Sequence, residues 1–184
     1  MRRLLLVLLV LVSAPGCLVV AVNPVHTRDA VAWEPGLVGE WQNVDDNSSI
    51  RVERGEWQSY NLEYAHPIEK GRLTGHLTTI GKNRYLDVMP ARGQDHGSFL
   101  LPLHVVLRIE LDGDRLELTP LSYDWFVDRV QKRVAIPGLK VVMDEKDNAL
   151  VVSPTAALRA WIGRQPDAAP SFAPGAVFVR KKAG

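Results

Sequence analysis

The sequence predicts a mainly β protein: a small antiparallel β-barrel with two short helices in its C-terminal half, preceded by an apolar N-terminal helix. Three observations predict this class. Apolar and polar residues alternate with period two in short runs through residues 38–152, which is typical of half-buried strands. Turn residues separate these runs, and two later segments carry apolar residues at helical spacing. Closure into a barrel is favoured over a sandwich because it removes exposed strand edges.

The N-terminal segment is built like an export signal. A basic start at residues 2–3 precedes an uninterrupted apolar run at 4–12 and small residues at 13–16, the three parts of a signal peptide. The stretch Ala14-Pro15-Gly16-Cys17 resembles the lipobox of bacterial lipoproteins. This resemblance implies cleavage before Cys17 and attachment of lipid, such as palmitate, to that residue.

A second interpretation of the same segment is an uncleaved membrane span. Leu4 to Val22 is a run of 19 residues without a charge, close to the ~20 that cross a bilayer as a helix. Breakers such as Asn23-Pro24 then predict a tether. We therefore expect a signal peptide at 1–16, a lipidated cysteine and tether at 17–36, and one barrel-like domain at 37–184.

The strands of the domain follow from the alternation. Ile50 and Val52 share one face, opposite Arg51 and Glu53. The clearest strand pair lies within residues 103–118, where apolar residues alternate on both sides of an Asp-Gly turn. Several inward-facing residues are candidates to line a ligand site inside the barrel: Leu73, Leu77, Leu103, Val105 and Leu107.

Two helices and a hairpin follow. Ser122 is a good N-cap for a helix that runs to about residue 133, and Ser153 is the expected cap of a second helix with Pro154 in its first position. A hairpin is expected between them, from residue 140 to 152. A last strand is expected at Ala176–Lys181.

The entrance to the first strand carries Gly39-Glu40-Trp41, which resembles the Gly-x-Trp motif of lipocalins. In that family the tryptophan closes one end of the barrel and a basic residue packs across the indole. The resemblance implies a lipocalin-like barrel with an end closed by Gly39, Trp41 and Arg180. The cation–π contact between the last two would contribute about 1 kcal/mol.

A broader resemblance links the chain to a group of uncharacterised Gram-negative envelope lipoproteins. It rests on Asn23 to Thr27, Pro35 to Trp41, Thr119 to Trp125 and Ser153 to Leu158. The resemblance implies a membrane-anchored domain that faces the periplasm, and it implies no activity. By resemblance to enteric lipoproteins, Leu18 in place of an aspartate after the cysteine implies the outer membrane.

Few residues suggest catalysis or metal binding. The five histidines include no pair at i, i+4, so a zinc site would need separate strands, and His76 and His104 are expected on polar strand faces. Asp95, His96 and Ser98 share one loop, where triad geometry is not normally reached. We expect no catalytic residues, no metal and no cofactor. One cysteine excludes an intrachain disulfide, and the net charge of +1 gives no footprint for nucleic acid.

Two functional hypotheses remain. The first is a non-catalytic, membrane-anchored module that binds an apolar ligand in its barrel, with some of the five tryptophans lining the cavity. The second is a structural or protein-interaction lipoprotein with a solid barrel, whose loop at 90–99 contacts an envelope protein. The uncleaved span would deliver either domain on a helix instead of a lipid, and an enzyme is the less favoured third class.

Overall fold

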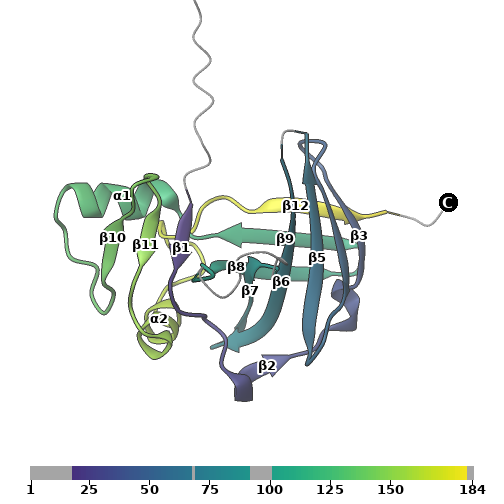
Figure 1. Ribbon diagram of the computed structural model, residues 1–184, viewed down its shortest axis with the longest axis horizontal. Coiled ribbons are helices and arrows are strands. Elements are labelled where there is room, and N and C mark those ends of the chain that lie inside the picture. The colour runs from purple at the N-terminus through teal and green to yellow at the C-terminus, as the bar shows by residue number, and fades with distance from the viewer. Residues whose placement is uncertain (1–17, 68, 92–100, 182–184) are drawn as a thin grey trace, which may run out of the picture.

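Nine strands form the larger of two β-sheets in this computed structural model, which describes residues 18–67, 69–91 and 101–181. All of them except β2 close into an antiparallel barrel, in which each strand pairs with the next barrel strand and β12 pairs back with β3 (Figure 1). The barrel strands are β3 (Gly39–Asn43), β4 (Ser49–Arg54), β5 (Ser59–His66), β6 (Glu69–Ile80), β7 (Asn83–Pro90), β8 (Val105–Asp112), β9 (Arg115–Pro120) and β12 (Ala176–Arg180).

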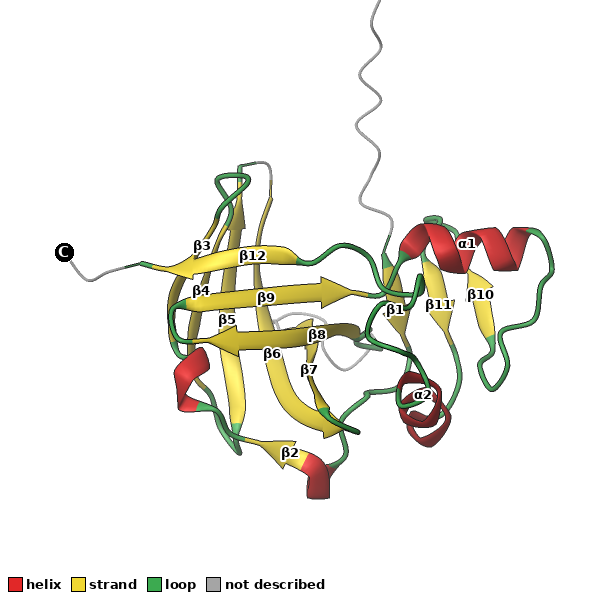
Figure 2. Cartoon of the chain, turned by 180° about the vertical axis from the view of Figure 1, so that it is seen from behind, coloured by secondary structure: helices red, strands yellow, loops and turns green. Residues whose placement is uncertain are grey.

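A second layer packs beside the barrel, as Figures 1 and 2 both show. Most of it is inserted between β9 and β12: α1 (Tyr123–Gln131), β10 (Val141–Met143), β11 (Ala149–Val151) and α2 (Thr155–Ile162). The N-terminal strand β1 (Val19–Ala21) completes it by pairing in parallel with β11. The chain then crosses to the barrel through the 3-10 helix η1 (Arg28–Ala30), the short strand β2 (Val31–Ala32) and the 3-10 helix η2 (Pro35–Leu37).

The expected mainly β, antiparallel barrel with two helices in its C-terminal half is confirmed, and its up-and-down order is that of a lipocalin-like barrel. Ser122 caps α1 as expected, because its side chain accepts the Trp125 N–H. The second cap differs: Pro154 occupies the N-cap of α2, and the Ser153 hydroxyl instead accepts the Lys140 N–H at 2.7 Å. The expected N-terminal apolar helix falls on residues outside the described ranges.

The expectation of a tether before residue 37 is wrong for residues 18–36. The three residues of β1 are at most 6% exposed, and Val25 is completely buried. A continuous apolar run without alternation also describes a strand that is covered on both faces, and Leu18 to Val22 is such a run. Within the described residues, no helix has the length and apolar character needed to cross a bilayer. Cys17 lies outside those residues, so its lipidation stays a prediction.

The two layers have separate cores. Inside the barrel, side chains such as Trp41, Tyr60 and Leu77 pack together. The outer core lies between the barrel wall and the second layer, where Tyr85 and Val106 from the barrel contact residues of β1, β11 and both helices. Part of the outward face of β7 and β8, at Tyr85, Asp87 and Val106, is therefore buried as well.

The lipocalin-like end closure has the expected contacts. The Arg180 guanidinium carbon lies 4.2 Å from the centroid of the buried Trp41 ring. Its Nη1 and Nη2 groups donate to the carbonyls of Val38 and Gly36 at 2.8 and 2.6 Å, while the Trp41 indole N–H donates to the Leu37 carbonyl at 2.9 Å. These bonds fix η2 across this end of the barrel.

Gly39 is required beside this contact. Its φ of +146° lies in a region that other residues rarely adopt, and an added Cβ would collide with the Arg180 guanidinium. The glycine of the Gly-x-Trp motif therefore makes room for the cation that covers the tryptophan.

Candidate functional site

The residues predicted to line a ligand site inside the barrel belong to its packed core. Leu77 is 1% exposed, and Leu73, Val105 and Leu107 pack against the same cluster of buried side chains. Leu103 precedes β8 and is only partly buried. Their proposed contact with a ligand stays a prediction.

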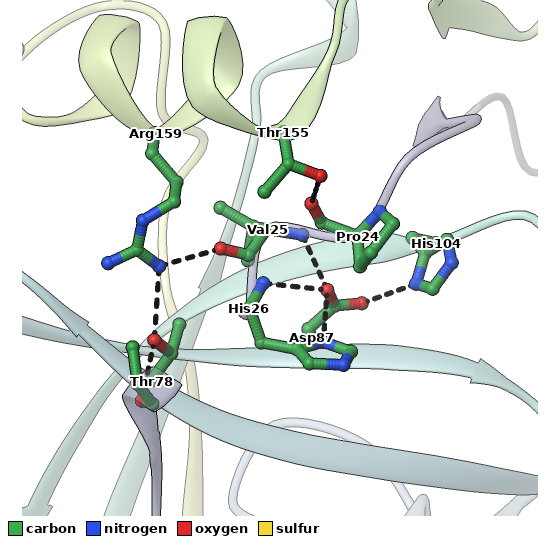
Figure 3. A network of polar contacts seen from close by, with 9 residues as sticks. Pro24, Val25, His26, Thr78, Asp87, His104, Thr155 and Arg159 are labelled. Atoms are coloured by element: carbon green, nitrogen blue, oxygen red, sulfur yellow. Dashed lines mark hydrogen bonds and ion pairs between the residues drawn. The ribbon is translucent and has the colours of Figure 1, made fainter. Parts of the chain in front are cut away.

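A buried carboxylate stands on the opposite, outward face of the barrel wall. Asp87 in β7 is 1% exposed and is surrounded by four donors (Figure 3). It accepts the Val25 and His26 backbone N–H groups at 2.6 and 3.3 Å, and it bonds Nδ1 of His26 at 2.9 Å and Nδ1 of His104 at 2.7 Å. Asp87 thus connects the N-terminal segment to the barrel.

These hydrogen bonds keep Asp87 ionised. Burial by itself would raise the pKa of the carboxyl, but the hydrogen bonds from His104 and His26 outweigh burial and hold its pKa well below the ordinary value. Both histidine side chains therefore present an Nδ1–H to a negative charge, which leaves each Nε2 as the remaining polar atom of the ring.

Helix α2 also binds the N-terminal segment around Val25, on the side opposite Asp87. The Thr155 hydroxyl donates to the Pro24 carbonyl at 2.7 Å, and Arg159 donates to the Val25 carbonyl at 2.7 Å and to the Thr78 hydroxyl at 3.1 Å (Figure 3). The segment around His26 is therefore held between β7, β6 and α2, which fixes the position of the His26 ring.

His26 and His76 border an open cleft on the outside of the barrel. Their rings stack with centroids 4.2 Å apart and an interplanar angle of 17°. The cleft has a volume of about 700 Å³ and is lined by His26, Arg28, Val31, Trp57, Gln58 and His76. Burial, together with the neighbouring His26, lowers the pKa of His76, so the His76 ring is neutral at physiological pH.

The hairpin tip between β4 and β5 forms the other wall. Trp57 is 91% exposed and has a φ of 52°, and Gln58 follows with a φ of 64°. A non-glycine residue in the left-handed region carries about 1–3 kcal/mol of backbone strain, and such residues cluster at functional sites. A large aromatic side chain exposed in this conformation beside a cleft indicates a binding surface.

The expectation that His104 sits on a solvated strand face is wrong, since it is 6% exposed and bonded to a buried carboxylate. His76 is likewise half-buried, stacked on His26. The physical reason is the N-terminal segment, which pairs with His104 through Ala21 and places His26 on His76. The sequence feature that could have predicted this buried network is Asp87, an acidic residue inside the apolar run Tyr85 to Met89.

Other predicted sites fall elsewhere. Asp95, His96 and Ser98, and nearly all of the proposed partner loop at 90–99, lie outside the described residues. Across the described ranges, no group of three or more His, Cys, Asp or Glu side chains has the arrangement of a metal site.

Comparisons were made with protein-family models, with curated proteins and with solved structures. None of the three returns a match for this chain.

Proposed function

We propose that this chain is a membrane-anchored bacterial envelope lipoprotein whose folded domain is a non-catalytic binding module, and that its ligand binds in the cleft outside the barrel. The observation that carries this proposal is the stacked His26–His76 pair facing a cleft of about 700 Å³ whose other wall is the exposed Trp57. The barrel faces the periplasm, and the outer membrane is the favoured site of anchoring.

The packed interior argues for the cleft over the barrel lumen. Trp41 and Tyr60 are both fully buried inside the barrel, among apolar side chains from its strands. An apolar ligand in the lumen would have to displace them, and close-packed cores resist such displacement. The solid barrel also suits the second hypothesis, a structural or protein-interaction lipoprotein, but that hypothesis leaves the cleft without a role.

The position of β1 supports a lipid anchor over an uncleaved span at residues 4–22. Val19 to Ala21 cannot lie in the bilayer and in the sheet at the same time. The remaining run from residue 4 to 18 has 15 residues and would reach about 22 Å as a helix, less than the ~30 Å hydrocarbon core. Acyl chains on Cys17 need no such length.

Replacing Cys17 with serine tests the anchor. With labelled palmitate, we expect label on the wild-type chain and none on Cys17→Ser, because the hydroxyl cannot take the place of the thiol as the acyl acceptor. Pro15→Ala, which keeps the cysteine, should retain label. Label on Cys17→Ser, or an unlabelled wild-type chain that stays in the membrane, would contradict lipid attachment at this residue.

Native mass spectrometry of the full chain, gently extracted from the membrane of a Gram-negative host, tests binding in the cleft. We expect the wild-type chain to carry an added mass that Trp57→Ala loses and Trp57→Phe keeps, because phenylalanine preserves a flat apolar face. Val44→Ala, at an exposed residue in the β3–β4 turn, is the control and should keep the mass. An unliganded wild-type chain, or full retention by Trp57→Ala, would contradict the proposal.

A further inference from the structure

The lining of the cleft carries a cation and no carboxylate. Arg28 is exposed and forms no ion pair with any described residue, while His26 and His76 are the other ionisable groups that line the cleft. No carboxylate belongs to that lining. Asp87 lies behind His26, where its four hydrogen bonds already satisfy it. The exposed Asp29 and Glu56 flank the lining residues Arg28 and Trp57 in the sequence but do not belong to the lining. The cleft therefore offers a cation that no described carboxylate pairs with.

His76 adds a neutral donor. Its Nδ1 is buried and has no hydrogen-bond partner among the described residues. A buried N–H without an acceptor is costly, so the neutral ring carries its proton on Nε2. Stacking against His26 fixes the plane of this ring. A ligand acceptor can therefore meet both the Arg28 guanidinium and the N–H of an imidazole.

Trp57 supplies a surface of a different kind. Its indole is almost fully exposed, and the left-handed backbone at residues 57 and 58 holds it on a short hairpin tip. A flat apolar face suits a ring that stacks on it. Gln58, beside it, adds amide donors and an acceptor at the same wall.

From this combination we propose that the cleft binds a small molecule that carries an anionic group on a flat ring, with the anion on Arg28 and His76 and the ring against Trp57. The anion is a phosphate or carboxylate, and the ring is aromatic or a sugar. This inference rests on the proposed function, because it names the class of ligand for the same cleft.

Isothermal titration of the full chain tests the ligand class. The detergent should be octaethylene glycol monododecyl ether, which has neither charge nor sugar. Phenyl phosphate and glucose 6-phosphate are the two ring anions, the ligands that carry an anion on a ring. Inorganic phosphate serves as the anion without a ring, and glucose as a ring without an anion. We expect at least one ring anion to bind about tenfold or more tighter than either part alone, and the stronger of the two identifies the ring.

Variants connect the result to the named residues. Arg28→Gln should lower the affinity for the ring anion by about 10- to 100-fold, since it removes a charge-assisted hydrogen bond. Trp57→Ala should lower the affinity for the ring anion to that for inorganic phosphate. Arg72→Gln removes an exposed arginine that does not belong to the cleft lining and should leave the affinity unchanged.

The ligand class would be overturned if neither ring anion bound more tightly than inorganic phosphate or glucose, or if Arg28→Gln kept full affinity for the ring anion that binds. The binding module itself would survive that result if the native mass still depends on Trp57. Loss of that dependence would overturn the proposed function instead.

Discussion

Asp87→Ala is expected to lower the free energy of unfolding by about 3–5 kcal/mol, the cost of breaking a buried charged network by removing one partner. The substitution leaves His104 Nδ1–H and two backbone N–H groups without their acceptor in a site that is 1% exposed. The N-terminal segment also loses its bond to β7. Urea unfolding of the full chain in detergent, followed by tryptophan fluorescence, measures the change.

A matched control distinguishes the effect of breaking this network from the effect of removing any surface carboxylate. Asp45→Ala removes a carboxylate that is exposed in the β3–β4 turn and should stay within about 0.5 kcal/mol of wild type. Asp87→Asn keeps the volume but replaces one acceptor oxygen with an NH₂ donor, which would face an N–H donor of a histidine. Its loss of unfolding free energy should therefore lie between those of Asp45→Ala and Asp87→Ala. A loss below about 1 kcal/mol for Asp87→Ala would show that the carboxylate does not hold the segment.

The contribution of Asp87 to the free energy of unfolding also depends on pH. The pKa of Asp87 is depressed in the folded chain, so its stabilisation is fully present above the pKa of about 3.9 that the group has when unfolded. It is lost as the pH falls below that value toward the folded pKa. The stability gap between wild type and Asp87→Ala should therefore be constant near neutral pH and shrink below about pH 4. A gap that widens in acid would contradict this linkage.

Strands such as β4 were predictable because one face lies in the barrel core and the other in water. Ile50 and Val52 alternate with Arg51 and Glu53, and those two apolar residues lie inside the barrel. The same alternation holds in β8. Local spacing is enough in such strands, since a period of two can be satisfied in only one way when one face is buried.

The second layer was not predictable by the same means. Val19 to Ala21 shows no alternation, because β1 is covered on both faces, and the pattern equally fits half of a membrane span. Its partner β11 lies 130 residues away, at Ala149 to Val151. No local feature of either segment encodes that parallel pairing.

The cleft depends on the same long-range arrangement. His26 and His76 are 50 residues apart, and they stack only because α2 and Asp87 hold the N-terminal segment against the barrel wall. Each histidine on its own looks like an ordinary polar residue. The Gly39–Trp41 end is just as long-range, because its partner Arg180 lies on β12 beside β3. It could be predicted only because the Gly-x-Trp resemblance implies a basic partner for the tryptophan.

Trp41→Ala is expected to be comparably damaging, at about 3–5 kcal/mol of unfolding free energy, the range for truncating a large buried aromatic residue. The indole is completely buried, and its loss would open a cavity in the barrel core and leave the Leu37 carbonyl without its donor. Arg180 would also lose the ring it covers, so the fastening of η2 weakens. Trp57→Ala makes the same chemical change at a residue that is 91% exposed and should cost no more than about 0.5 kcal/mol. Equal losses for the two variants in urea unfolding would mean that Trp41 does not close and fill the barrel.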